Sequence, residues 1–200
     1  DWFTDFDAYF ASGVARTQII AMANWYLRAS TPTSMQALQM LQVPVVDALT
    51  GEVLARTVMV QGEGALPAAG NYVVNGHSRG GDLTTIFSRL FNSRVTSSYT
   101  YNGLGVGQNF PESFTAEIET TLGLGATSWA AVDAKQKNYY AEHGISVATT
   151  DWWLRQRGER IPVFNEEETG ISNHLMYKLT DTLALYDVLG TLDGGLSLAS

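Results

Sequence analysis

The sequence contains no cysteine, and it has few basic residues, few prolines and no long apolar run. The absence of cysteine excludes disulfide scaffolds, thiolate metal sites and cysteine nucleophiles. With 12 basic and 20 acidic residues, the formal net charge is −8, which repels nucleic-acid phosphates and anionic membranes. No stretch approaches the ~20 apolar residues that a membrane-spanning helix needs. We therefore expect neither a nucleic-acid partner nor a transmembrane segment.

The residues that are present suit one packed domain of 200 residues, with 45% hydrophobic and 11% aromatic side chains. No basic segment followed by an apolar segment opens the chain, so no signal peptide is visible. The first residue is Asp1 rather than Met, which leaves open a processed form or a piece of a longer chain. This composition fits the cytosol and also fits bacterial secretion.

The first third of the chain predicts one helix and one hairpin. Apolar residues at helical spacing predict a helix over residues 14–28, which Thr31-Pro32 ends. Two runs rich in β-branched residues, 43–48 and 53–60, flank Thr50-Gly51. This pattern is typical of a hairpin, which we expect as an insertion at about 43–61.

From residue 70 onwards, predicted strands alternate with predicted helices. The strands are expected at 72–75, 95–101, 137–141 and 161–164. The helices are expected at about 83–91, at 112–122 and from about 173 onwards. Such alternation predicts an α/β fold, with a mostly parallel sheet and flanking helices.

The strongest motif is Gly76-x-Ser78-x-Gly80, which matches the G-x-S-x-G pattern of a nucleophile elbow. In such an elbow the serine lies on a tight turn between a strand and a helix, and glycines two residues away avoid a collision. The helix then directs its N-terminal N–H groups at the site, where they favour a developing oxyanion. The apolar strand before the motif and the amphipathic helix after it supply the required context, although a glycine-rich turn with a structural serine would look alike.

A serine needs a base to become a nucleophile at neutral pH, and the base is usually histidine. The chain has three histidines. His77 adjoins the serine and is expected to be structural. His174 follows the last predicted strand at the start of the last helix, which is where the order serine, acid, histidine places the base. We expect His174 to be the base, against the alternative of a histidine near a helix N-terminus without a chemical role.

The acid that would orient this histidine is expected between Ser78 and His174, just after a strand. Glu142 follows the strand 137–141 directly, and Asp151 is its competitor nine residues further on. Asp133 lies at the wrong end of the same strand. We interpret the three consecutive glutamates at 166–168 as part of a solvated loop. We favour Glu142.

The segment Asn75-Gly76-His77-Ser78-Arg79-Gly80-Gly81 resembles the GHSLGG elbow of class 3 lipases and their bacterial relatives, except for Arg79 in place of leucine. Thr100-Tyr101-Asn102-Gly103 and Asn173-His174 resemble the following strand and the histidine end of that group. Residues 138–144 and 160–164 are similar to lipase-like domains in large secreted bacterial proteins. The resemblance covers about residues 70–190.

The resemblance implies an α/β-hydrolase-type fold and ester hydrolysis through an acyl-enzyme, on small-molecule or lipid esters. It implies a triad of Ser78, an acid and His174, and an oxyanion hole that uses the backbone N–H of Arg79. The family's earlier strands and second oxyanion donor would then lie upstream of Asp1. It also implies an extracellular, secreted protein that degrades lipid.

Two other functions fit the same residues. A non-catalytic interaction or scaffold domain could keep this fold without activity, and an acyltransferase could use the same triad with another acceptor. No metal or organic cofactor is implied, and no D-x-D-x-D-G calcium loop is present. The hairpin would be either a cap over the acyl pocket or an ornament packed at the edge of the fold.

Overall fold

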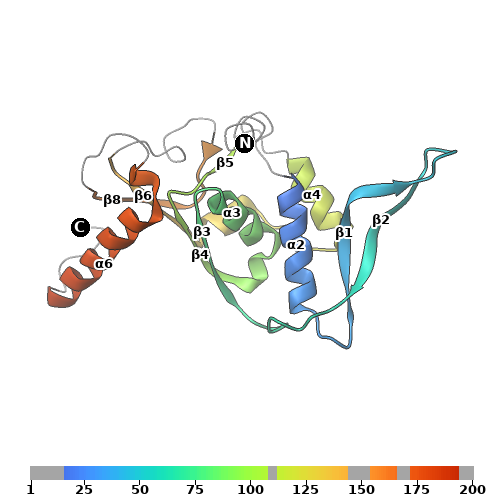
Figure 1. The fold of residues 1–200 in the computed structure, drawn as a ribbon, viewed down its shortest axis with the longest axis horizontal. Coiled ribbons are helices and arrows are strands. Elements are labelled where there is room, and N and C mark those ends of the chain that lie inside the picture. The colour runs from blue at the N-terminus through green and yellow to red at the C-terminus, as the bar shows by residue number, and fades with distance from the viewer. Residues whose placement is uncertain (1–15, 108–111, 144–153, 166–171, 194–200) are drawn as a thin grey trace.

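The computed structural model describes residues 16–107, 112–143, 154–165 and 172–193 (Figure 1). At its centre is a four-stranded parallel sheet in the order β3-β4-β6-β8. These strands are β3 (Tyr72–His77), β4 (Val95–Tyr101), β6 (Gln136–Ala141) and β8 (Glu159–Val163). The predicted α/β class with a mostly parallel sheet is therefore confirmed, and each predicted strand of the second half is present.

One face of this sheet is covered by helix α3 (Gly80–Leu90), with α2 (Arg16–Ser30) packed on α3 (Figure 1). The main hydrophobic core lies here and also includes residues of α4 (Glu112–Thr121). The buried stripe of α2 is Ile19, Ile20, Ala23, Tyr26 and Ala29. Met22 and Leu27 of the same helix are only half-buried and pack against the margin of this core.

The opposite face is covered in part by α6 (Met176–Leu192). Leu179 is fully buried against Ala141 and Val163, and the rings of Tyr101 and Tyr139 stack beside them at 5.6 Å. Helices on both faces are what a parallel sheet needs, because both of its faces must be removed from water. The arrangement leaves the carboxyl ends of the strands at one common edge.

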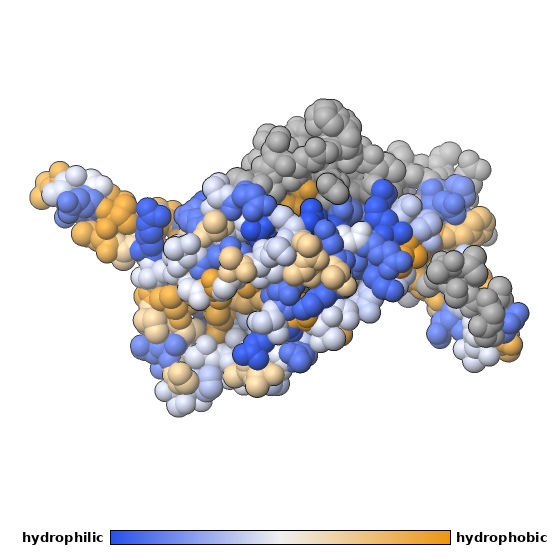
Figure 2. Space-filling model, turned by 180° about the vertical axis from the view of Figure 1, so that it is seen from behind, coloured by the Kyte–Doolittle hydropathy of each residue, from blue (hydrophilic) through white to orange (hydrophobic). Residues whose placement is uncertain are grey.

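The hairpin consists of β1 (Gln36–Val46) and β2 (Val53–Gln61), which pair antiparallel. It begins seven residues before the predicted position 43, because Gln36–Met40 pair in regular register with β2 and Asn24 of α2 holds the Met40 backbone through two hydrogen bonds. The turn is the predicted one, with Gly51 at φ 72°. The far part of the hairpin projects away from the sheet and exposes apolar side chains, among them Val43, Leu49 and Leu54 (Figures 1 and 2).

Several short elements were not predicted. Helix α5 (Trp129–Asp133) is one turn long and is capped by the Ser128 side chain. Strands β5 (Val106–Gly107) and β7 (Leu154–Arg155) form a two-residue antiparallel pair, and 3₁₀ turns η1 (Asn92–Arg94) and η2 (Ser172–His174) precede β4 and α6. Such elements are too short to leave a periodic signal. None of the helices in the described part of the chain is long and apolar enough to cross a membrane.

Candidate active site

Ser78 lies between the end of β3 and the start of α3, at the carboxyl edge of the sheet. Its φ is 53°, in the left-handed region that non-glycine residues rarely adopt. Three backbone hydrogen bonds hold it there: its N–H donates to the Tyr101 carbonyl at 3.1 Å, and its own carbonyl accepts from the Gly81 and Leu104 N–H groups at 2.9 and 2.8 Å. Such strain costs on the order of 1–3 kcal/mol and persists only where the surroundings impose it.

The glycines of the motif are not equivalent. A Cβ at Gly76 would overlap the Gly80 carbonyl and the Thr84 hydroxyl, and a Cβ at Gly81 would lie 2.5 Å from the Gly103 Cα. A Cβ at Gly80 would meet no described atom within 4 Å. The expectation that both glycines two residues from Ser78 avoid collision is therefore right for Gly76 and wrong for Gly80, where Gly81 has that role instead.

His174 closes the 3₁₀ turn that precedes α6, and it reaches the elbow from the far end of the chain. Its Nε2 lies 2.8 Å from the Ser78 Oγ, although the two residues are 96 positions apart. This is the separation a general base needs to take a hydroxyl proton. The side chains of Ser78 and His174, singled out in the sequence as a pair, are thus brought into hydrogen-bond contact.

The environment of His174 favours the neutral imidazole. The residue is 9% exposed, and this burial lowers the pKa of His174 below its ordinary value of 6.5. The charge of the neighbouring His77 ring lowers that pKa further. Only a neutral imidazole can accept a proton, so the shift keeps the residue in the form that can act as a base.

The acid is the part of the expected triad that the described residues do not supply. The Nδ1 of His174 is buried and has no hydrogen-bond partner among them. Glu142 does follow β6 at the same edge of the sheet, with its N–H bonded to the Val163 carbonyl, but its side chain is exposed. The position of Asp151 and the glutamate run 166–168 lie outside the described residues.

Asp133, the third acidic candidate, has another role. Its carboxylate accepts hydrogen bonds from the Arg157 guanidinium at 2.8 Å and from the Gly158 N–H at 3.1 Å. These contacts lie at the amino end of β6, opposite to the edge that carries Ser78. The sequence argument that placed Asp133 at the wrong end of the strand is confirmed.

Arg79, the expected backbone donor to an oxyanion, directly precedes α3. Its N–H belongs to the first turn of that helix, where amide groups have no partner within the helix and the helix dipole is positive. Asn102, which the sequence linked only to the family pattern, lies at the same edge after β4. It is 0% exposed and has φ 43°, the second non-glycine residue with a positive φ in the described chain.

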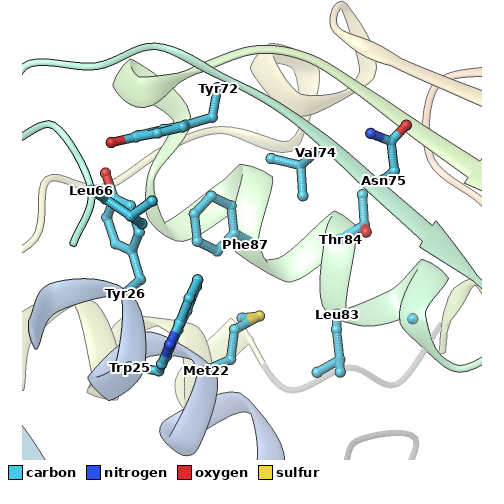
Figure 3. A pocket seen from close by; sticks show the side chains of 11 residues that line it. Met22, Trp25, Tyr26, Leu66, Tyr72, Val74, Asn75, Leu83, Thr84 and Phe87 are labelled. Atoms are coloured by element: carbon cyan, nitrogen blue, oxygen red, sulfur yellow. The ribbon is translucent and has the colours of Figure 1, made fainter. Parts of the chain in front are cut away.

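A trough of about 390 Å³ runs between α2, α3 and β3 (Figure 3). Its wall is almost entirely apolar and is formed chiefly by Met22, Trp25, Tyr26, Leu66, Tyr72, Val74, Leu83 and Phe87. Its polar end includes Gly80, two residues after Ser78, together with Asn75 and Thr84. No hairpin residue lines it, so the hairpin is not a cap over this trough. A second cavity, of about 500 Å³, lies around Arg94 at the other end of α3 and is half polar.

No family model matches the chain, and no curated protein matches it in sequence at a significant level.

Proposed function

We propose that the chain is a serine ester hydrolase that cleaves carboxylic esters through an acyl-enzyme. The observation that carries this proposal is the 2.8 Å contact between Ser78 Oγ and His174 Nε2, made by a serine held at a positive φ between a parallel strand and a helix. A strained turn that presents a hydroxyl to an imidazole is the arrangement that serine hydrolases use. The motif's resemblance to the elbow of class 3 lipases supports the same reaction.

The proposed reaction has two halves. In the first, His174 Nε2 takes the Ser78 proton while Oγ attacks the ester carbonyl carbon. The carbonyl oxygen becomes an oxyanion, which the Arg79 N–H at the start of α3 stabilises. When the tetrahedral intermediate collapses, the His174 proton passes to the departing alcohol. In the second half, water attacks the acyl-Ser78 ester by the same route and releases the acid.

The acid of this triad is proposed to be Glu142 or Asp151, as the sequence suggested. A buried Nδ1–H without an acceptor costs about 1–3 kcal/mol, so a carboxylate that meets it would be favoured. It would also fix the tautomer in which Nε2 is free to accept the serine proton. Glu142 lies at the correct edge of the sheet, directly after β6.

The trough beside the elbow supports an ester with an apolar acyl chain. Pockets for small molecules are mostly apolar, with a few polar groups that fix orientation, and this trough has that composition. Gly80 lines the polar end of the trough and lies two residues after Ser78, and a Cβ built on it would meet open space. We therefore propose that the acyl chain lies along α3, between Leu83 and Met22.

The second candidate is a scaffold domain that keeps the fold without the reaction. One observation favours it, namely the His174 Nδ1 that has no partner among the described residues. A serine and histidine without an orienting acid react slowly. An acyltransferase would use the same groups with a different acceptor, and competition between water and an added alcohol would separate it from a hydrolase.

The test of the proposed function is hydrolysis of p-nitrophenyl butyrate by the wild type and by Ser78→Ala. Ser93→Ala is the matched control, because Ser93 is exposed on the turn before β4, at the opposite edge of the sheet. The proposal predicts turnover by the wild type and by Ser93→Ala, and a loss of at least about 10³-fold in Ser78→Ala. Equal rates for all three proteins would contradict it.

A further inference from the structure

The backbone carbonyl of His174 receives two side-chain donors. The Nε2 of His77 lies 2.8 Å from this oxygen, and the Nδ2 of Asn102 lies 3.3 Å from it. Because a carbonyl oxygen only accepts hydrogen bonds, His77 must carry its proton on Nε2. Asn102 Nδ2 makes a shorter bond, of 2.9 Å, to the carbonyl of Asn173. The two residues thus hold the backbone from which the His174 ring extends.

Asn102 is itself fixed from several sides. Its N–H donates to the Tyr139 carbonyl at 2.8 Å, and its side-chain oxygen accepts from the Ala141 N–H at 2.9 Å. Its backbone is strained, with φ 43°, and its side chain is fully buried. Asparagine tolerates this conformation better than most residues. One side chain therefore ties the end of β6 to the segment that carries His174.

His77 connects that segment to the elbow. It is the last residue of β3 and directly precedes Ser78, so residues 77 and 78 both contact His174, one through its carbonyl and the other through its ring. Two bonds at two different points of His174 restrain its position relative to the serine more than either would alone. The sequence predicted a structural role for His77 but did not predict this contact.

We propose that His77 and Asn102 are positioning residues of the hydrolase, which hold the His174 backbone so that Nε2 stays within reach of Ser78 Oγ. This inference rests on the proposed function. Misplacement of a catalytic group by about 1 Å can cost about 10²-fold in rate. Loss of either donor should therefore lower kcat and leave KM nearly unchanged, since neither side chain is part of the acyl trough.

The experiment compares variants that keep or remove each donor. His77→Gln keeps an amide donor near the position of Nε2, whereas His77→Phe keeps a ring and removes the donor. Asn102→Asp keeps the shape of the side chain but replaces its amide by a carboxylate. A carboxylate cannot donate to a carbonyl, so both donated hydrogen bonds are lost. Asn71→Asp is the matched control, because Asn71 is exposed before the amino end of β3.

The readouts are kcat and KM for p-nitrophenyl butyrate and the thermal midpoint of each variant. We expect kcat to fall about 10²-fold in His77→Phe and Asn102→Asp, with KM within about twofold of wild type. His77→Gln should recover most of the loss, and Asn71→Asp should match the wild type. If Asn102→Asp is unfolded at the assay temperature, the comparison of His77→Gln with His77→Phe tests the positioning role.

Two failures can be distinguished. If the wild type shows no turnover that depends on Ser78, the proposed function is wrong. If the wild type does show such turnover but His77→Phe and folded Asn102→Asp retain its kcat, the positioning role alone is overturned. Equal losses in His77→Gln and His77→Phe would also overturn it, because the donor would then be irrelevant.

Discussion

The imidazole rings of His77 and His174 lie 5.2 Å apart, tilted by 39° to each other. At this distance a proton on one ring disfavours a proton on the other. Burial acts in the same direction on His174 and is the larger of the two effects on its pKa. The pair therefore keeps the proposed base in its neutral form at neutral pH.

The pH dependence of kcat/KM follows from this relationship. The activity requires neutral His174, so it should be constant above the pKa of His174 and fall as the pH drops through it. Burial and His77 lower that pKa, whereas a carboxylate at Nδ1 would raise it, so the midpoint of the acidic limb should lie below 6.5 in the variant that lacks the triad acid. In His77→Gln the second charge is absent and the midpoint should move to higher pH. A midpoint at or above 6.5 in that acid-free variant would contradict this account of the site.

The acid can be assigned by two substitutions that preserve shape. Glu142→Gln and Asp151→Asn each remove one carboxylate, and the one that orients His174 should lower kcat by about 10²–10⁴-fold. The other should change kcat by no more than a few fold. Steady-state kinetics on both variants, with Glu52→Gln on the exposed hairpin turn as control, makes the assignment. If neither substitution changes kcat, the triad has no acid from these positions.

Alanine substitutions at the two elbow glycines should differ strongly in their effect on stability. Gly76→Ala should destabilise the fold by about 3 kcal/mol or more, because the new Cβ would overlap the Gly80 carbonyl and the Thr84 hydroxyl. Gly80→Ala should change stability by less than about 1 kcal/mol, since its Cβ meets open space and alanine favours a helix. Urea unfolding of the two variants measures both values. Similar losses in both would show that the elbow is packed differently.

The trough makes a prediction about chain length. Leu83→Trp should fill the part of the trough next to Gly80 and should lower kcat/KM for p-nitrophenyl octanoate much more than for p-nitrophenyl acetate. Leu54→Trp, on the exposed part of the hairpin, is the control and should leave both values unchanged. If Leu83→Trp left the ratio of the two kcat/KM values unaltered, the acyl chain would not lie in this trough.

A buried ion pair beside the core offers a test of the fold itself. Arg89 of α3 and Glu119 of α4 are each about 5% exposed and lie 3.4 Å apart, and the Arg89 guanidinium also bonds Glu112 at 3.0 Å. Removal of one partner of a buried pair costs about 3–5 kcal/mol when the other is left alone. Because Glu112 remains, Glu119→Gln should cost about 2–3 kcal/mol in urea unfolding. A change below about 0.5 kcal/mol would show that the pair between Arg89 and Glu119 does not contribute to stability.

The parts of the site that the sequence predicted are those with local signals. The elbow is a contiguous strand, turn and helix, so the spacing of Gly76 and Ser78 together with the flanking apolar patterns indicated it. His174 was found because the order of strands in an α/β fold fixes where the last loop lies. Both arguments depend on the backbone path rather than on side-chain packing.

The parts that the sequence missed depend on side-chain direction and on partners distant in the chain. The role of His77 requires the carbonyl of a residue 97 positions away, for which no pattern exists. Glu142 follows β6 as the sequence indicated, but the direction of a side chain at a strand end depends on register, which periodicity does not fix. The hairpin begins at Gln36 because its first residues pair with β2. The sequence of those residues carries no signal of that pairing.

The central claim is that His174 activates the Ser78 hydroxyl, and covalent labelling tests it without knowledge of the substrate. A fluorophosphonate probe is incubated with the wild type and with His174→Ala, and the labelled peptide is mapped. The account predicts that the wild type is modified at Ser78 and that His174→Ala, folded as judged by circular dichroism, reacts at least about 10²-fold more slowly. A folded wild type that is not labelled, or that is labelled at the same rate without His174, would contradict the claim.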